Sequence, residues 1–149
     1  MMENDKTILL AGATGYLGSY IAKELATRQI PTKILVRNTE KAKDLKSDYT
    51  KIIKAEVTKP EALNGHFQYV DTVISTIGIT RQKDGLTYMD VDYQANKNLL
   101  DEARKAGVRK FIYVSVLNGN LYRNLKILEA KEAFVDEVIV FPLFPHYAS

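Results

Sequence analysis

The chain has 149 residues, of which 46% are hydrophobic and 26% are charged, and its net charge is +3. This length and composition fit one folded globular domain and do not fit a disordered chain. The sequence has no cysteine, which excludes disulfides, zinc ribbons and thiol nucleophiles, and its two histidines, His66 and His146, are too far apart in sequence to favour a metal site.

The charged residues alternate in sign, as in RNTEKAKDLKSD at residues 37–48. A nucleic-acid surface needs clustered basic residues, so we expect a solvated surface and no nucleic-acid partner. No apolar run approaches the roughly 20 residues that a membrane span needs. The amino-terminal MMENDK is polar and acidic, unlike a signal peptide. We therefore expect a cytoplasmic protein without a membrane partner.

Short β-branched runs alternate with helical patterns along the chain, which is typical of a parallel sheet built from βαβ units. In chain order the pattern predicts strand Thr7–Ala11, helix Tyr16–Arg28, strand Thr32–Val36, helix Thr39–Leu45, strand Lys51–Ala55, a helical turn at Pro60, strand Thr72–Thr76, helix Tyr88–Ala106, strand Phe111–Ser115 and a helix from about Tyr122 to Asp136. Val138–Phe141 is either a sixth strand or an exposed apolar tail that invites dimerisation or aggregation.

The order of these elements predicts a doubly wound α/β fold of Rossmann type. Right-handed crossovers place helices on both faces of the sheet, giving three layers. We expect the strand order 3-2-1-4-5, with the possible sixth strand at the edge. Ligands should bind at the carboxyl ends of the first and fourth strands, where the strand order reverses.

A glycine-rich turn, GATGYLG, follows the first expected strand. Gly12 permits the tight turn, Gly15 lets a pyrophosphate approach the backbone, and Gly18 lets helix and strand pack closely. The helix N-terminus supplies N–H donors for phosphate, and the hydroxyl of Thr14 adds a contact. The spacing differs from G-x-G-x-x-G, and no Gly-Lys-Ser/Thr follows as in a P-loop. The candidate cofactor-binding residues of the turn are Gly12, Thr14, Gly15, Tyr16, Leu17 and Gly18.

The end of the second expected strand indicates which dinucleotide binds. Arg37 stands where NAD-binding proteins place an acid that accepts the ribose hydroxyls. An arginine suits the 2′-phosphate of NADP through charge-assisted hydrogen bonds, and Asn38, Thr39 and Lys41 lie nearby in sequence to assist. The alternative is a surface arginine that only ends a strand. We predict NADP(H) in preference to NAD(H).

Several segments together resemble the atypical short-chain dehydrogenase/reductase superfamily, in particular its NmrA-like and NAD(P)-binding epimerase-like families. The matching pieces are GATGYLGS, LVRNTEKA, AEVTKPEAL, DTVISTIG, DVDYQANKNLLDEARKAGVRKFIYVS and EAKEAF. They cover most of residues 7–135, in the order that the family has them.

The resemblance implies roles for residues beyond the turn. Glu56 and Val57 match a position near adenine, and Asn98 matches an asparagine of the long helix. The loop after the fourth strand, which packs along the cofactor, is matched by Ser75, Thr76, Ile77 and Gly78. Ser115 matches the active-site serine. For each of these residues, the alternative is a side chain that faces solvent or satisfies local backbone groups.

Enzymes of this superfamily use a Tyr-x-x-x-Lys pair, in which tyrosine exchanges a proton with the substrate carbonyl and lysine holds the ribose. One register of this chain gives Tyr122 and Lys126, but Tyr122 is only seven residues after Ser115, closer than the family spacing. The other has the family spacing and gives Ile127 and Lys131. We prefer the second register, which keeps the lysine and loses the tyrosine. Another acid, such as Tyr122 or a bound water, would then donate the proton.

The families that this sequence resembles continue into a carboxyl-terminal substrate lobe, whereas this sequence ends with VIVFPLFPHYAS. We expect residues 1–149 to be one NAD(P)-binding domain without that lobe. The chain is then a truncated or frame-altered product, or a minimal relative reduced to the cofactor half.

Three functional interpretations follow. The first is an NADP(H)-dependent oxidoreductase that reduces a small carbonyl or quinone-like compound, with Ser115 polarising the carbonyl and Lys131 on the ribose. The second is a non-catalytic NADP(H)-sensing module that acts through a protein partner, which the isoleucine at position 127 and the absent lobe favour. The third is a scaffold that binds no nucleotide. The resemblance also implies a homodimer through the long helix and the helix after it.

Overall fold

The computed structural model describes residues 7–78, 86–116 and 137–143. In chain order the elements are β1 (Thr7–Ala11), α1 (Tyr16–Thr27), β2 (Thr32–Val36), the 3₁₀ helix η2 (Thr39–Leu45), β3 (Thr50–Lys54), the 3₁₀ helix η3 (Pro60–Leu63), β4 (Val70–Ser75), α2 (Leu86–Ala106), β5 (Lys110–Val116) and β6 (Glu137–Leu143). The expected helix at 122–136 lies outside the described residues.

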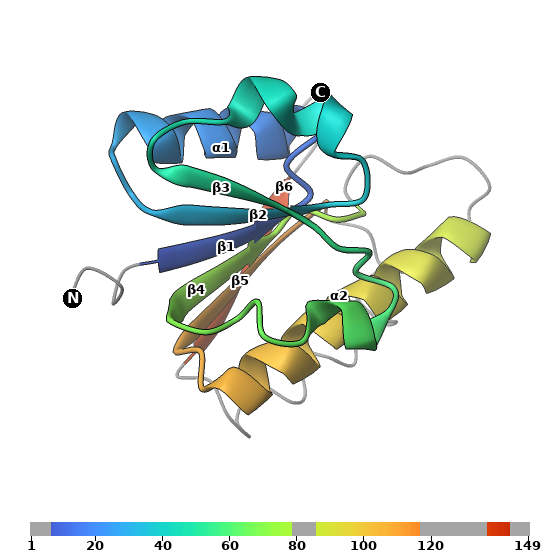
Figure 1. Ribbon diagram of the computed structural model, residues 1–149. Coiled ribbons are helices and arrows are strands. Elements are labelled where there is room, and N and C mark those ends of the chain that lie inside the picture. Colours follow the sequence, from blue (N-terminus) through green and yellow to red (C-terminus); the bar gives the residue numbers. More distant parts are fainter. Residues whose placement is uncertain (1–6, 79–85, 117–136, 144–149) are drawn as a thin grey trace.

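The strands form one six-stranded sheet in the order β3-β2-β1-β4-β5-β6. Every neighbouring pair is parallel, with Leu9 of β1 opposite Lys33 of β2 on one side and Val73 of β4 on the other. Helices α1 and η2 cover one face, and α2 and η3 cover the other (Figure 1). The predicted three-layer Rossmann-type fold and its strand order 3-2-1-4-5 are confirmed.

The core divides between the two faces of the sheet because consecutive side chains of a strand point to opposite sides. Leu10 and Ile34 pack with Ala22 of α1 and with Leu45 of η2. The other face is larger. Its fully buried residues come from β1, β4, α2, η3 and β5: Leu9, Val73, Leu99, Leu63 and Phe111. Both helical layers are therefore held by apolar contact with the sheet, which fixes where the loops at the strand ends lie.

The observed bounds differ from the expected ones by a few residues. Helix α1 ends at Thr27 because Gln29 has a φ of 59°, and the N–H of Ile30 then donates to the carbonyl of Leu25 at 3.0 Å, which closes the helix. Residues 39–45 form a 3₁₀ helix. Residues 137–143 form β6 in parallel register with β5, so the strand alternative for the carboxyl-terminal segment holds.

Candidate functional site

The glycine turn joins β1 to α1 at the carboxyl edge of the sheet. The N–H of Gly15 donates to the carbonyl of Gly12 at 3.1 Å, and α1 begins at Tyr16 without a side-chain cap. The first N–H groups of α1, from Tyr16 and Leu17 onward, therefore point toward the carboxyl edge of the sheet as donors for an anion.

A different structural reason accounts for glycine at each of the three positions of this turn. Gly12 has a φ of 97°, a backbone angle that residues with a side chain rarely adopt. A methyl group on Gly18 would collide with the carbonyl of Gly12 and lie 2.9 Å from the Cα of Ala13. Gly15, in contrast, has an ordinary extended φ of −84°, and a methyl group there would meet only the carbonyl oxygen of Gly12, at 3.5 Å. Protein packing explains Gly12 and Gly18 and leaves open space in front of Gly15.

A depression of about 380 Å³ adjoins the turn, lined by Thr14, Val36, Arg37, Asn38, Lys41 and Glu56. The side chains of Arg37, Asn38 and Lys41 are exposed. The Oδ1 atom of Asn38 accepts the N–H of Glu40 at 2.9 Å and so begins η2. The structure thus brings together Thr14, Arg37, Asn38 and Glu56 from three loops that are separate in the sequence, with two cations beside the turn.

The carboxylate of Glu56 lies at the rim of this depression. It forms an ion pair with Lys59 at 3.6 Å and accepts the hydroxyl of Thr58 at 3.5 Å. Val57 is half-buried and packs against the larger core cluster. Both residues follow β3, and the position predicted to lie near adenine is therefore at the same edge of the sheet as Arg37.

Ser75, the last residue of β4, and Thr76 directly after it are buried. The hydroxyl of Ser75 is fully buried and donates to Oδ1 of Asn96 at 2.5 Å, and the N–H of Ile77 donates to that same hydroxyl at 3.3 Å. The hydroxyl of Thr76 donates to the carbonyl of Gly12 at 3.2 Å. Gly78 has a φ of 98°. Ser75 and Thr76 use their side chains to hold this loop and tie it to the glycine turn.

Asn98 is also buried, and its amide bonds to the protein. Its Nδ2 donates to the carbonyl of Val57 at 2.9 Å, and its Oδ1 accepts from Gln94 at 2.8 Å. Its neighbour Asn96, which the sequence interpretation did not select, has its Nδ2 3.5 Å from the carbonyl of Ile77. The only available signal for Asn96 was a second asparagine two residues before Asn98 in the same helix.

The catalytic candidates are placed only in part. Ser115 lies near the carboxyl end of β5, in register with Pro142 of β6. Tyr122 and Lys131, with the alternative residues Lys126 and Ile127, lie outside the described residues. Ser115 thus lies at the carboxyl edge of the sheet, the edge that also carries the glycine turn.

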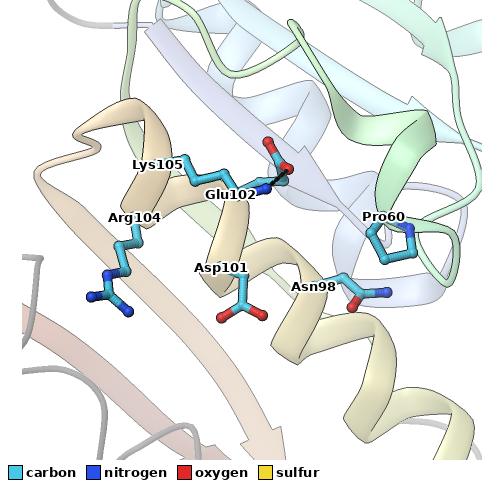
Figure 2. A pocket seen from close by; sticks show the side chains of 6 residues that line it. All are labelled: Pro60, Asn98, Asp101, Glu102, Arg104 and Lys105. Atoms are coloured by element: carbon cyan, nitrogen blue, oxygen red, sulfur yellow. Dashed lines mark hydrogen bonds and ion pairs between the residues drawn. The ribbon is translucent and has the colours of Figure 1, made fainter.

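A second depression, of about 550 Å³, lies between η3 and the carboxyl-terminal half of α2 (Figure 2). Its lining combines both signs of charge, and Glu102 pairs with Lys105 at 3.2 Å inside it. It shares no residue with the depression at the glycine turn. Across the part of the chain that the structure describes, no group of three metal-ligating side chains occurs. Among the described helices, none is both long and apolar enough to cross a bilayer.

Comparison with known proteins agrees with this geometry. A family model described as NAD(P)H-binding matches residues 12–137. The chain belongs to this NAD(P)H-binding family. The family match contains the whole glycine turn, the loops after β2, β3 and β4, and helix α2.

One curated protein to which the chain is similar is the photosystem II assembly factor Ycf39 of Synechocystis sp. The two are 32% identical over 124 residues, which correspond to 83% of this chain and 38% of that protein. The chain thus spans well under half the length of this relative. Among solved structures, UDP-glucose 4-epimerase superposes with a TM-score of 0.78 at 17% identity, covering 93% of this chain and 51% of that one.

The NADPH-dependent quinone oxidoreductase QOR2 of Escherichia coli, solved with NADPH, superposes with a TM-score of 0.68 at 23% identity, covering 89% of this chain and 47% of that one. These structural likenesses show the fold. The family match shows a nicotinamide dinucleotide-binding domain.

Proposed function

We propose that this NAD(P)H-binding domain prefers NADP(H) to NAD(H) and is the cofactor half of an oxidoreductase of the atypical short-chain dehydrogenase/reductase type. The observation that carries the preference is the depression beside the glycine turn, where Arg37 and Lys41 are exposed and the hydroxyl side chain of Thr14 lines the same hollow. Two cations there suit a dianionic 2′-phosphate, which the ribose of NAD lacks.

The bound dinucleotide would extend from this depression across the glycine turn. The open space in front of Gly15 supports an approach of the pyrophosphate to the backbone. The nicotinamide half would then lie toward the loop after β4 and the carboxyl end of β5, which carries Ser115. When bound, the cofactor supplies or accepts a hydride. The chain's own residues hold the dinucleotide, and Ser115 would polarise a substrate carbonyl with Lys131 on the ribose.

The substrate class we propose is a small carbonyl or quinone-like compound. The quinone oxidoreductase among the structural neighbours supports this choice. The cytoplasm as location and a homodimer as assembly are part of the same proposal and follow from the sequence interpretation above.

The second candidate is a regulatory NADP(H)-binding module that acts through a protein partner. Ile127 at the family's tyrosine position favours it, because an alkyl side chain cannot donate a proton. The relative in Synechocystis is named as an assembly factor, which also agrees with this candidate.

The cofactor preference is tested by titration calorimetry with NADPH and NADH. We expect NADPH to bind more tightly. Arg37→Ala should weaken the affinity for NADPH about 10- to 100-fold, which corresponds to the loss of one or two hydrogen bonds to a charged group. The affinity for NADH should stay within about twofold of the native value. Arg28→Ala is the matched control, since Arg28 is exposed at the far end of α1 and pairs with Glu24. Equal affinity of the native protein for both dinucleotides would overturn the preference.

Activity is tested separately with a panel of small carbonyls and quinones, by following NADPH absorbance. Turnover supports the oxidoreductase. Tight NADPH binding without turnover across the panel supports the regulatory module.

A further inference from the structure

Helix α2 carries two buried asparagines, Asn96 and Asn98, of which 1% and 4% of the surface is exposed. Residues two apart on a helix point about 200° away from one another, so they do not share a face. Both can be buried here because α2 lies along the sheet with β4 on one flank and η3 on the other (Figure 1). The two amides therefore reach different loops from one rigid element.

Asn98 reaches the loop after β3. Figure 2 shows its amide on the side of α2 that faces η3 and Pro60. Its Nδ2 donates to the carbonyl of Val57 at 2.9 Å, while Gln94, one turn earlier, donates to its Oδ1 at 2.8 Å and so fixes which way the amide points. The held carbonyl is next to Glu56, which lines the depression beside the glycine turn.

Asn96 reaches the loop after β4. Its Oδ1 accepts the hydroxyl of Ser75, that hydroxyl accepts the N–H of Ile77, and Nδ2 of Asn96 lies 3.5 Å from the carbonyl of Ile77. Both backbone groups of Ile77 are thereby tied to α2, directly or through Ser75. The next residue, Gly78, has a φ of 98°, so the chain turns sharply directly after this anchor.

Burying an amide in a helix costs free energy, because asparagine is a weak helix former and its polar atoms lose water. A leucine of similar size would be buried at either position at lower cost. In exchange for that cost, each amide here fixes one backbone carbonyl, which an apolar side chain cannot do. Both fixed carbonyls belong to loops at the edge where a dinucleotide binds in this fold.

We propose that Asn98 and Asn96 are positioning residues for opposite halves of the cofactor. Asn98 sets the loop on the adenine side, at Glu56–Val57, and Asn96 sets the loop on the nicotinamide side, at Ile77–Gly78. This assignment rests on the proposed binding of NADP(H). It replaces the expectation that Asn98 itself contacts the cofactor, since both of its amide atoms are bonded to the protein.

The test separates the two halves of the cofactor with a fragment. Adenosine 2′,5′-bisphosphate has the adenine side of NADP and lacks the nicotinamide. Asn98→Leu should weaken the affinity for NADPH and for the bisphosphate by the same factor, about 3- to 10-fold, as expected when one hydrogen-bonded loop is displaced. Asn96→Leu should weaken NADPH by a similar factor and leave the bisphosphate within about twofold. Lys97→Ala, between them and exposed, is the control that should change neither affinity.

A second pair of variants covers the case in which a leucine variant does not fold. Gln94→Ala removes the bond that orients Asn98, and Ser75→Ala removes the hydroxyl between Asn96 and Ile77. They should reproduce the same split with smaller factors. Equal weakening of both ligands by both members of the pair, or no weakening by either, overturns the assignment of halves. Failure of the native protein to bind either ligand would instead overturn the proposed cofactor.

Discussion

The two halves of the carboxyl edge use polar side chains in opposite ways. In the half built by β1, β2 and β3, Arg37 and Lys41 are exposed around an open depression. In the half built by β4 and α2, Ser75, Thr76 and Asn96 are buried and bond to the protein itself. The difference separates recognition from positioning. Substitution of an exposed side chain in the first half should change ligand affinity alone, whereas substitution of a buried side chain in the second half should change both stability and affinity.

The largest effect should come from the packing beneath the first half. Gly18→Ala places a methyl group 2.7 Å from the carbonyl carbon of Gly12 and 2.9 Å from the Cα of Ala13, where only backbone can give way. We expect the free energy of unfolding to fall by about 3 kcal/mol, near the upper end for an overpacked site. Denaturant unfolding followed by circular dichroism measures this loss.

Gly15→Ala is the matched control for that variant. Its methyl group meets only one protein atom, at 3.5 Å, and its φ of −84° suits alanine. Stability should fall by at most about 1 kcal/mol, because alanine is less favoured than glycine at the N-cap of α1, while NADPH binds more weakly because the methyl group occupies the space for the pyrophosphate. If Gly15→Ala instead destabilised the protein as much as Gly18→Ala, glycine at position 15 would be required by the fold, and its presence would no longer support pyrophosphate binding.

The next effect concerns the link between the halves. Thr76→Val keeps the side-chain shape and removes the hydroxyl that donates to the carbonyls of Gly12 and Ala11, at 3.2 and 3.4 Å. Those carbonyls also accept backbone N–H groups, so the loss should be about 1 kcal/mol. The midpoint of denaturant unfolding measures it, and exposed Thr27→Val on α1 is the control. A large change in NADPH affinity with unchanged stability would show that Thr76 recognises the ligand.

The sequence predicts most of this fold for physical reasons that act locally. Buried parallel strands appear as apolar β-branched runs, and the turn residues between them limit the connections. The segment at 138–141 stayed ambiguous because an apolar run of that length fits either a buried strand or an exposed tail. Its pairing with β5 is a long-range contact, which no local pattern specifies.

The candidate site divides along the same comparison. Arg37 was identifiable because its position after β2 determines where it points, and the structure places it at the depression. Ser75 and Asn98 were selected as ligand contacts, yet their partners are Asn96 and Val57, distant in sequence. A polar residue type does not reveal whether its partner is a ligand or a loop, and only burial in the folded chain decides this.

A smaller effect should follow from the cation at the rim of the depression. Lys41→Ala should weaken NADPH about threefold, as expected for one exposed charge near a phosphate, and leave NADH and the unfolding midpoint unchanged. The effect should decrease as salt rises from about 0.05 to 0.5 M, because exposed charges are screened. Lys43→Ala is the control, since Lys43 lies on the same 3₁₀ helix, pairs with Glu40 and does not line the depression.

The smallest effect lies away from both halves, at Lys33, the second residue of β2, which bonds to the segment that precedes β4. Lys33 in β2 donates to the carbonyls of His66 and Gln68 at 3.1 and 2.9 Å. Burial, and then the nearby charge of Lys51, lower the pKa of Lys33 below its ordinary 10.5. Between the lowered pKa and 10.5 the unfolded chain binds more protons than the folded one, so the free energy of unfolding should rise with pH in that window.

Lys33→Met should remove this contribution, and Lys51→Met should reduce it by removing the second cause of the lowered pKa. The measurement is urea unfolding at several pH values from about 8 to 10.5, with the difference between native protein and variant taken at each pH because the other lysines and the tyrosines titrate in both. A difference that does not change with pH would mean that the two carbonyls compensate for the lost water around the ammonium group. Lys33 would then contribute to stability through its two hydrogen bonds alone, independently of pH in this range.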